Sequence, residues 1–212
     1  MQLTARDLEI VRTLSLKVRI FSLRQLASSW WKPTKVGQDN ARRRLLAVCD
    51  AGLLECTQVM ARPLPAIQAP VATWTPGEPE PDFGSASWLL QSRWTEPPRQ
   101  TTVYLATKKG ANRYGAPRRG GLKHSLQATH DLGVSEVYLQ LLRADPDAAS
   151  EWVGEDTFAS SRRGQKLPDA MLVAASGGEP KMVIEFGGAY ARHRLESLHR
   201  DCQARNLPYQ VW

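Results

Sequence analysis

The chain has 212 residues, which is enough for one large domain or two of modest size. Its 28 Lys and Arg residues outnumber its 21 Asp and Glu residues, and the net charge of +7 favours a polyanionic partner. No apolar run approaches the roughly 20 residues that span a bilayer, and the N-terminus lacks the basic start and apolar core of a signal peptide. The three cysteines are odd in number and include no CxxC pair, which disfavours a disulfide framework and a zinc finger. We therefore expect a cytoplasmic protein without a membrane partner.

The first 60 residues predict three helices followed by a strand. Thr4-Ala-Arg-Asp7 has the form of a capping box and opens a helix that runs through Leu16. Ser22 opens a second, shorter helix, and a turn leads into a third helix that ends at Gly52. Residues 53–59 then alternate as a strand. This order is typical of a winged helix-turn-helix, whose third helix enters the major groove of DNA.

The third helix, residues 37–53, combines an apolar stripe with a polar side that suits base edges and phosphates. The expected buried stripe is Leu45, Leu46, Val48 and Cys49. Consecutive residues lie about 100° apart around a helix, so three adjacent arginines cannot all face a groove, and Arg44 is expected to turn toward the protein. Gln38 and Asn40 are the candidates for base edges, and the whole set of candidate DNA contacts in this region is Lys32, Lys35, Gln38, Asn40, Arg42, Arg43 and Arg44. The alternative is an ordinary solvated amphipathic helix.

Residues 60–100 predict a β-hairpin inserted in the wing. Eight of the 14 prolines lie here, which excludes a long helix, and the tryptophans need a place to pack. Two strands, residues 70–74 and 85–94, are expected on either side of a turn-rich acidic loop. An acidic tip does not suit DNA, so we assign the hairpin to internal packing or protein contact.

The wing is expected to close with a returning strand at residues 101–105, followed by a short helix that Thr107 caps. Residues 108–123 form a second basic run without an acid, although such a run is often only a solvated face. The candidates for phosphate contact that it adds are Lys108, Lys109, Arg118 and Arg119. The Gly- and Pro-rich loop in this run marks a boundary between a DNA-binding domain, residues 1–118, and a second domain, residues 119–212.

The second half of the chain predicts a helix, three strands, a helix and a strand. The expected spans are 125–142, 152–158, 169–175, 181–186, 190–205 and 208–212, with a turn at Gly177-Gly178. This αβββαβ order indicates an α/β layer in which helices cover a sheet, so the fold class of the whole chain is α+β with an α/β second half.

Two acids are placed unusually in this sheet. Asp169 begins an apolar strand, and Glu185 lies within the next one, where burial of a carboxylate is costly without a compensating partner. If the two strands pair antiparallel, the two carboxylates can meet near one end of the sheet. Carboxylates gathered in this way hold Mg²⁺ for phosphodiester hydrolysis.

The αβββαβ order with Pro168-Asp169 and Glu185 resembles the PD-(D/E)xK, restriction-endonuclease-like superfamily. The resemblance implies a catalytic and metal-binding role for Asp169 and Glu185, and it gives Glu136 the place of an additional acid. The lysine that the superfamily carries two residues after the second acid is missing, because Gly187 occupies that position. That lysine polarises the scissile phosphate or positions the attacking water, so a nuclease would need a substitute for it, and the candidates are Lys166, Lys181, Arg192 and His193.

Over most of its length the chain also resembles the plasmid replication-relaxation protein family. The matching blocks, in order, are LTARDLEIVRTL, ARRRLLAVCDAGLL, VYLATKKGANRYG, HDLGVSEVYLQL and the pair LPDAMLV and VIEFGGAY. The resemblance implies a sequence-specific double-stranded DNA-binding accessory or regulatory protein of a plasmid or integrated mobile element, acting in replication, mobilisation or transcription. A homodimer and a replication or mobilisation protein are the expected partners, and no cofactor is expected. The alternative is a Mg²⁺-dependent nuclease or nickase.

Overall fold

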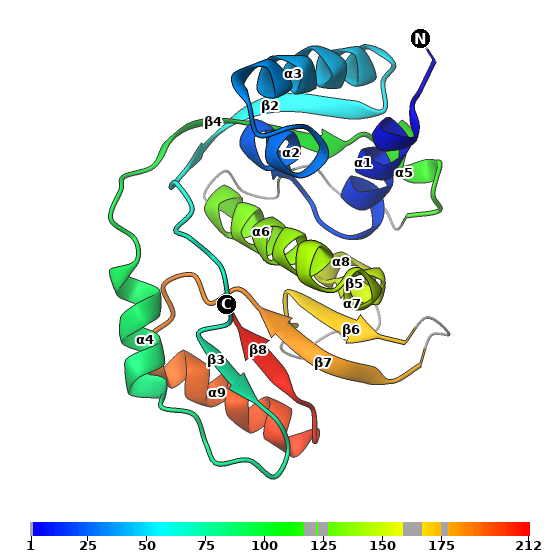
Figure 1. The fold of residues 1–212 in the computed structure, drawn as a ribbon. Coiled ribbons are helices and arrows are strands. Elements are labelled where there is room, and N and C mark those ends of the chain that lie inside the picture. Colours follow the sequence, from blue (N-terminus) through cyan, green and yellow to red (C-terminus); the bar gives the residue numbers. More distant parts are fainter. Residues whose placement is uncertain (1, 117–121, 123–126, 159–166, 175–177) are drawn as a thin grey trace. The chain divides into compact units, whose positions relative to one another are not determined.

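The computed structural model describes residues 2–116, 122, 127–158, 167–174 and 178–212 (Figure 1). The protein is a mixed α+β structure with two sheets. It divides into two compact units, each built from two stretches of chain. We call Met1–Arg62 with Pro98–Leu139 the first unit, and Pro63–Pro97 with Gln140–Trp212 the second unit.

The first unit follows the predicted order of three helices and a strand, with a short extra strand before the second helix. Its elements are α1 (Ala5–Leu16), β1 (Phe21–Ser22), α2 (Leu23–Trp30), α3 (Lys35–Asp50), β2 (Leu54–Ala61), β4 (Arg99–Ala106), α5 (Lys108–Asn112) and most of α6 (Ala128–Ala144). The capping boxes at Thr4 and Ser22 are both formed, and Thr107 caps α5 as predicted. The antiparallel sheet has the order β1-β4-β2, and β2 pairs with β4 from Leu54↔Ala106 to Ala61↔Arg99.

The predicted boundary near residue 118 differs from the observed division, because most of α6 packs within the first unit. Ser135 Oγ donates a hydrogen bond to the carbonyl of Ile20, and Gln25 Nε2 donates to the carbonyl of Leu132 at 2.9 Å. Arg19 also forms an ion pair with the buried carboxylate of Asp131. The inserted segment also differs from prediction in its place, because residues 63–97 belong to the second unit and not to the wing of the first.

The second unit is built on a five-stranded sheet of order β3-β8-β7-β6-β5. Strands β7 and β8 run parallel, and the other neighbours are antiparallel. The elements are β3 (Ala72–Trp74), α4 (Phe83–Ser92), α7 (Pro146–Ser150), β5 (Trp152–Gly154), α8 (Glu155–Phe158), β6 (Ala170–Val173), β7 (Pro180–Glu185), α9 (Arg192–Ala204) and β8 (Tyr209–Val211). Along the chain, the order α6-β5-β6-β7-α9-β8 agrees with the predicted helix, three strands, helix and strand, with α7 and α8 as short additions, although most of α6 belongs to the first unit.

The predicted hairpin at residues 60–100 is wrong in its second arm. Residues 83–92 form helix α4, because Asp82 accepts hydrogen bonds from the N–H groups of Gly84 and Ser85 and so caps a helix there. Strand β3 pairs with β8 instead of with this segment. The predicted strand 152–158 is also shorter, ending at Gly154, and Gly177 of the predicted turn lies outside the described residues.

Helix α3 is fixed to α1 by a charge pair. Asp7 is 1% exposed, and its carboxylate accepts hydrogen bonds from Arg44 Nε at 3.0 and 3.1 Å. Burial raises the pKa of Asp7, but hydrogen bonds from Arg44 and Thr4 outweigh it and hold the pKa below its usual value. The ion pair therefore stabilises the folded protein above the unfolded-state pKa of Asp, about 3.9.

We predict that Asp7→Asn lowers the free energy of unfolding at neutral pH by about 1–3 kcal/mol, because a charged hydrogen-bond acceptor is lost from a buried position. In the wild type, this contribution disappears as the pH falls through the lowered pKa of Asp7, so the difference between the two proteins should shrink in acid. Urea unfolding between pH 3 and pH 7, with the exposed-site variant Glu55→Gln as control, checks this. A difference that stays constant over this pH range would contradict it.

Candidate functional site

Helix α3 is held from behind by four residues at helical spacing, Gly37, Ala41, Leu45 and Val48. Gly37 is required by space, because a Cβ there would lie 2.1 Å from the carbonyl oxygen of Lys32. The predicted stripe was right for Leu45 and Val48 and wrong for Leu46, which is 45% exposed. The buried positions repeat at intervals of four and three residues, which leaves residue 46 on the opposite side of the helix.

The outer side of α3 carries exposed polar side chains. The predicted DNA contacts that are exposed on this helix, or just before it, are Lys32, Lys35, Gln38, Asn40, Arg42 and Arg43. Within the described part of the chain, the side chains of Gln38 and Arg42 make no hydrogen bond or ion pair, whereas Arg43 donates a hydrogen bond to Asn40 Oδ1. Gln38 and Asn40 are about 200° apart around the helix, so they lie on opposite flanks, Gln38 beside Arg42 and Asn40 beside Arg43.

Arg44 is turned toward the protein, as the helical geometry predicts. In addition to its bonds with Asp7, Arg44 Nη2 donates to the carbonyl of Gln2 at 2.8 Å. Its guanidinium is therefore engaged in holding α1 against α3. We remove Arg44 from the candidate DNA contacts, because its role in this structure is to orient the helix that carries the others.

The second basic run is less available than predicted. Lys109 Nζ donates to the carbonyl of Ala51 at 2.8 Å, so it binds the C-terminal end of α3, where the helix dipole favours a cation. Lys108 is exposed and remains a candidate. Arg118 and Arg119 lie outside the described residues.

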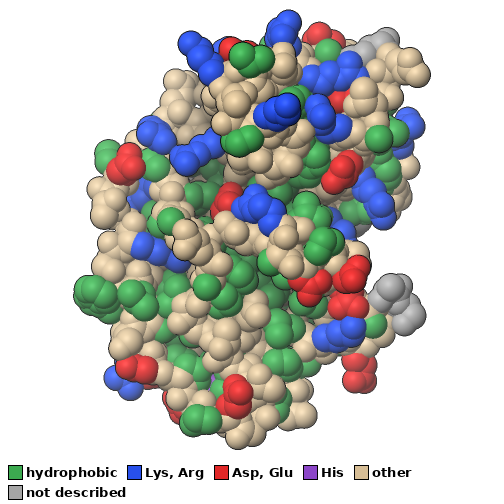
Figure 2. All heavy atoms as spheres, viewed as in Figure 1, with side chains coloured by type: hydrophobic (Ala, Val, Ile, Leu, Met, Phe, Trp, Pro, Cys, Tyr) green, Lys and Arg blue, Asp and Glu red, His purple; other side chains and the backbone are tan. Residues whose placement is uncertain are grey.

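The charge of the chain is divided unequally between the two units. The first unit contains 18 of the 28 Lys and Arg residues and 7 of the 21 Asp and Glu residues, a formal charge of +11. The second unit contains the remaining 10 basic and 14 acidic residues, a formal charge of −4. Figure 2 shows Lys and Arg side chains over the region of α3, with some Asp and Glu side chains between them. The surface that suits a polyanion therefore belongs to the first unit.

In the second unit, Asp169 and Glu185 meet as predicted. The antiparallel register Ala170↔Ile184 brings the two residues to the same end of strands β6 and β7. Asp169 Oδ2 accepts a hydrogen bond from the N–H of Phe186 at 2.8 Å, and Glu185 Oε2 accepts one from the N–H of Asp169 at 3.2 Å. The other oxygen, Glu185 Oε1, accepts from the hydroxyl of Tyr190 at 2.6 Å. Each of the two carboxylates thus accepts a hydrogen bond from a backbone N–H group at or next to the other acidic residue.

Among the described residues, Arg194 is a cation linked to this pair that the sequence analysis missed. Arg194 Nη2 donates to the hydroxyl of Tyr190 at 2.7 Å, and its guanidinium carbon lies 3.7 Å from the centre of the Tyr190 ring. Burial, followed by the charges of Glu185 and Asp169, raises the pKa of Tyr190 far above its usual value, so the hydroxyl stays protonated and donates. The signal in the sequence is the four-residue spacing of Tyr190 and Arg194.

Two of the four proposed replacements for the missing lysine form ion pairs with other residues. Lys181 forms an ion pair with Glu151 at 2.6 Å, and Arg192 forms one with Glu196 at 2.7 Å. His193 is exposed on α9. Lys166 lies outside the described residues.

Gly187 occupies a position that has no room for a lysine side chain. A Cβ at this residue would lie 2.8 Å from Leu90 Cδ1 and 2.9 Å from Val211 Cγ1. Leu90 is fully buried and comes from α4, the helix of the inserted segment. The space that a lysine would need is therefore filled by an apolar side chain of the protein itself.

Glu136 belongs to the first unit, where its Oε2 accepts a hydrogen bond from Gln25 Nε2 at 3.1 Å. This contact attaches helix α6 to α2.

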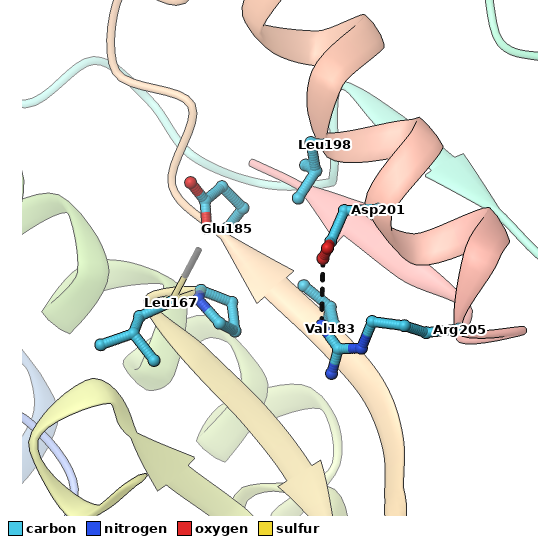
Figure 3. A pocket seen from close by; sticks show the side chains of 7 residues that line it. Leu167, Val183, Glu185, Leu198, Asp201 and Arg205 are labelled. Carbon is cyan, nitrogen blue, oxygen red and sulfur yellow. Dashed lines mark hydrogen bonds and ion pairs between the residues drawn. The ribbon is translucent and has the colours of Figure 1, made fainter. Parts of the chain in front are cut away.

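A narrow, mainly apolar hollow adjoins Glu185 (Figure 3). Its lining comes from the segment before β6, from β7 and from α9: Leu167, Pro168, Val183, Glu185, Leu198, Asp201 and Arg205. Asp201 and Arg205 form an ion pair at 3.0 Å, one helical turn apart on α9 (Figure 3). Glu185 itself is only 3% exposed, so the hollow gives a substrate little access to the carboxylates.

Asp169 and Glu185 are the residues that a magnesium site here would use, because Mg²⁺ is commonly held by one or two carboxylates and waters. In this structure both oxygens of Glu185 accept hydrogen bonds from protein donors. In the described ranges of the chain, no group of three or more His, Cys, Asp or Glu side chains is placed to hold a metal ion.

Comparison with known proteins found no relatives. No family model matches the chain, and neither a curated protein nor a solved structure matches it. No helix in the described part of the chain is long and apolar enough to cross a membrane.

We predict that Gly187→Ala lowers the free energy of unfolding by about 1–3 kcal/mol, because its methyl group overpacks the contact with Leu90. Leu90→Ala alone should cost about 2–5 kcal/mol through the cavity that it leaves. The double variant should be more stable than the sum of the two effects indicates, since each change relieves the other. Urea unfolding of the four proteins measures this coupling, and additive effects would show that the contact is wrong.

We also predict that millimolar Mg²⁺ leaves the melting temperature of the wild type unchanged. A ligand that binds only the folded state raises stability in proportion to the logarithm of its concentration. Thermal unfolding with Mg²⁺, with Ca²⁺ and with a chelator checks this prediction. A rise that depends on Mg²⁺ and disappears in Asp169→Asn would establish a metal site and refute our interpretation of the carboxylate pair.

Proposed function

We propose that the protein binds double-stranded DNA sequence-specifically through the outer side of α3. The observation that carries this proposal is the combination of exposed Gln38, Asn40, Arg42 and Arg43 with a helix that is fixed from behind. Amide and guanidinium groups form paired hydrogen bonds with the edges of adenine and guanine, and guanidinium groups also bind phosphates. A rigid helix presents such groups without a large ordering cost.

The topology of the first unit supports assignment to the winged helix-turn-helix class. The element order α1-β1-α2-α3-β2-β4 with the sheet order β1-β4-β2 agrees with a three-helix core followed by a two-stranded wing. In such a domain α3 is the recognition helix. The inserted segment leaves this sheet after Arg62 and returns at Pro98, at the far end of the β2–β4 pair.

The division of charge supports DNA as the partner of the first unit and argues against it for the second. A formal charge of +11 attracts a polyanion and accelerates encounter with it, whereas −4 repels one. We propose that the second unit is a non-catalytic domain of restriction-endonuclease-like topology that supports protein contacts. The whole chain then acts as an accessory or regulatory DNA-binding protein, as the resemblance to the replication-relaxation family implies.

Two observations on the described residues weigh against the nuclease alternative. Glu185 is engaged by Tyr190 and by the backbone of Asp169, and the position of the missing lysine is filled by Leu90. We therefore propose binding without cleavage.

We predict that the double variant Arg42→Ala with Arg43→Ala binds duplex DNA more weakly and with a smaller dependence on salt. Each lost phosphate contact should reduce the slope of log K against log salt by about 0.9, because fewer counterions are released. Fluorescence anisotropy of a labelled duplex between 50 and 300 mM NaCl measures both quantities.

The matched control is Arg192→Ala with Arg200→Ala, which removes two exposed arginines from α9 of the second unit. This control should bind as the wild type does. Circular dichroism should show that both double variants remain folded, since the four side chains are exposed. Unchanged affinity and slope in the α3 variant would refute the proposed interface.

A further inference from the structure

The outer side of α3 also carries two large apolar side chains. Val36 is 68% exposed and Leu46 is 45% exposed. Among the residues that the structure describes, the other exposed large hydrophobic side chains are Met60, Trp88 and Leu89. Two of the five therefore lie on a helix whose outer side is otherwise polar.

Each apolar side chain continues a row of the proposed DNA contacts. Val36 lies one turn before Asn40 and two turns before Arg43, and these positions share one flank of the helix. Leu46 lies one turn after Arg42, on the other row. The groups that bind bases and the apolar groups thus face the same partner.

Asp39 indicates which part of DNA this strip faces. It is exposed between the two rows, and its carboxylate makes no hydrogen bond or ion pair within the described residues. A carboxylate directed at the phosphate backbone would be repelled, whereas in the major groove it can accept a hydrogen bond from the amino group of cytosine. The strip that contains Asp39 and the apolar side chains is therefore suited to the floor of the groove.

We propose that Val36 and Leu46 contact the C5-methyl groups of thymine in the major groove. This inference rests on the proposed function and names the bases that it involves. The thymine methyl is the apolar group that base edges present in the major groove. The two residues are ten positions apart, about 15 Å along the helix at ~1.5 Å per residue. With a spacing of ~3.4 Å per base, the two thymines lie about four base pairs apart.

The experiment compares thymine with deoxyuridine, which keeps the hydrogen-bonding pattern and lacks the methyl group. A preferred duplex is first selected from a random pool by the wild-type protein, and each thymine of that duplex is then replaced singly. At two positions the replacement should raise the dissociation constant of the wild-type protein about fourfold. This is the effect expected when one methyl group is no longer buried in the interface. Val36→Ala should abolish the difference at one position, and Leu46→Ala should abolish it at the other.

The matched control is Leu89→Ala, which removes a side chain of similar exposure, 46%, from α4 of the second unit. It should keep the full preference for thymine. If no duplex is selected, the proposed function itself fails. If a duplex is selected but lacks thymine, is insensitive to the replacement, or stays sensitive in both α3 variants, only the methyl contact is refuted. Loss of self-association without a change in base preference would show that these side chains cover each other in a dimer, which also refutes it.

Discussion

The ion pair between Arg44 and Asp7 sets the rotation of α3 about its own axis. Three consecutive arginines point in directions about 100° apart, so fixing one determines the other two. With Arg44 bound to a buried carboxylate of α1, Arg42 and Arg43 are left on the exposed side. The same rotation exposes Val36 and Leu46 and buries Ala41, Leu45 and Val48. The proposed interface, polar and apolar parts together, follows from this constraint.

The second unit is held together around two buried or half-buried acids. The oxygens of Asp169 and Glu185 accept hydrogen bonds from backbone N–H groups beside the ends of β6 and β7 and from the hydroxyl of Tyr190. The inserted segment packs beside them, because α4 supplies the leucine that contacts Gly187. It also supplies β3, which extends the sheet beside β8. The insertion is therefore an integral part of the second unit.

Local signals in the sequence predicted much of the fold. Thr4, Ser22 and Thr107 cap helices at the expected residues, and the meeting of Asp169 with Glu185 follows from strand alternation and antiparallel pairing. Features that depend on distant contacts were missed. Residues 83–92 are flanked by proline-rich segments, which disfavoured a helix in the sequence analysis. Their helix is stabilised by burial of one face, including Leu90, in the second unit. The attachment of α6 to the first unit likewise depends on Gln25, which is more than 100 residues away in sequence.

The candidate site was predictable where helical geometry decides and unpredictable where packing decides. The inward turn of Arg44 required only the angle between residues. The exposure of Leu46 required knowledge of which face of α3 the core takes, and the sequence places leucines on both sides. The engagement of Lys109 at the end of α3 and of Arg194 on Tyr190 could not be distinguished from solvated surface charges without the fold.

The central claim is that α3 reads duplex DNA, and selection from a random duplex pool tests it most directly. The wild-type protein should enrich a defined sequence, and the Arg42→Ala, Arg43→Ala variant should enrich it much less under the same conditions. Failure of the wild type to enrich any sequence, or equal enrichment of the same sequence by the variant, would contradict the account.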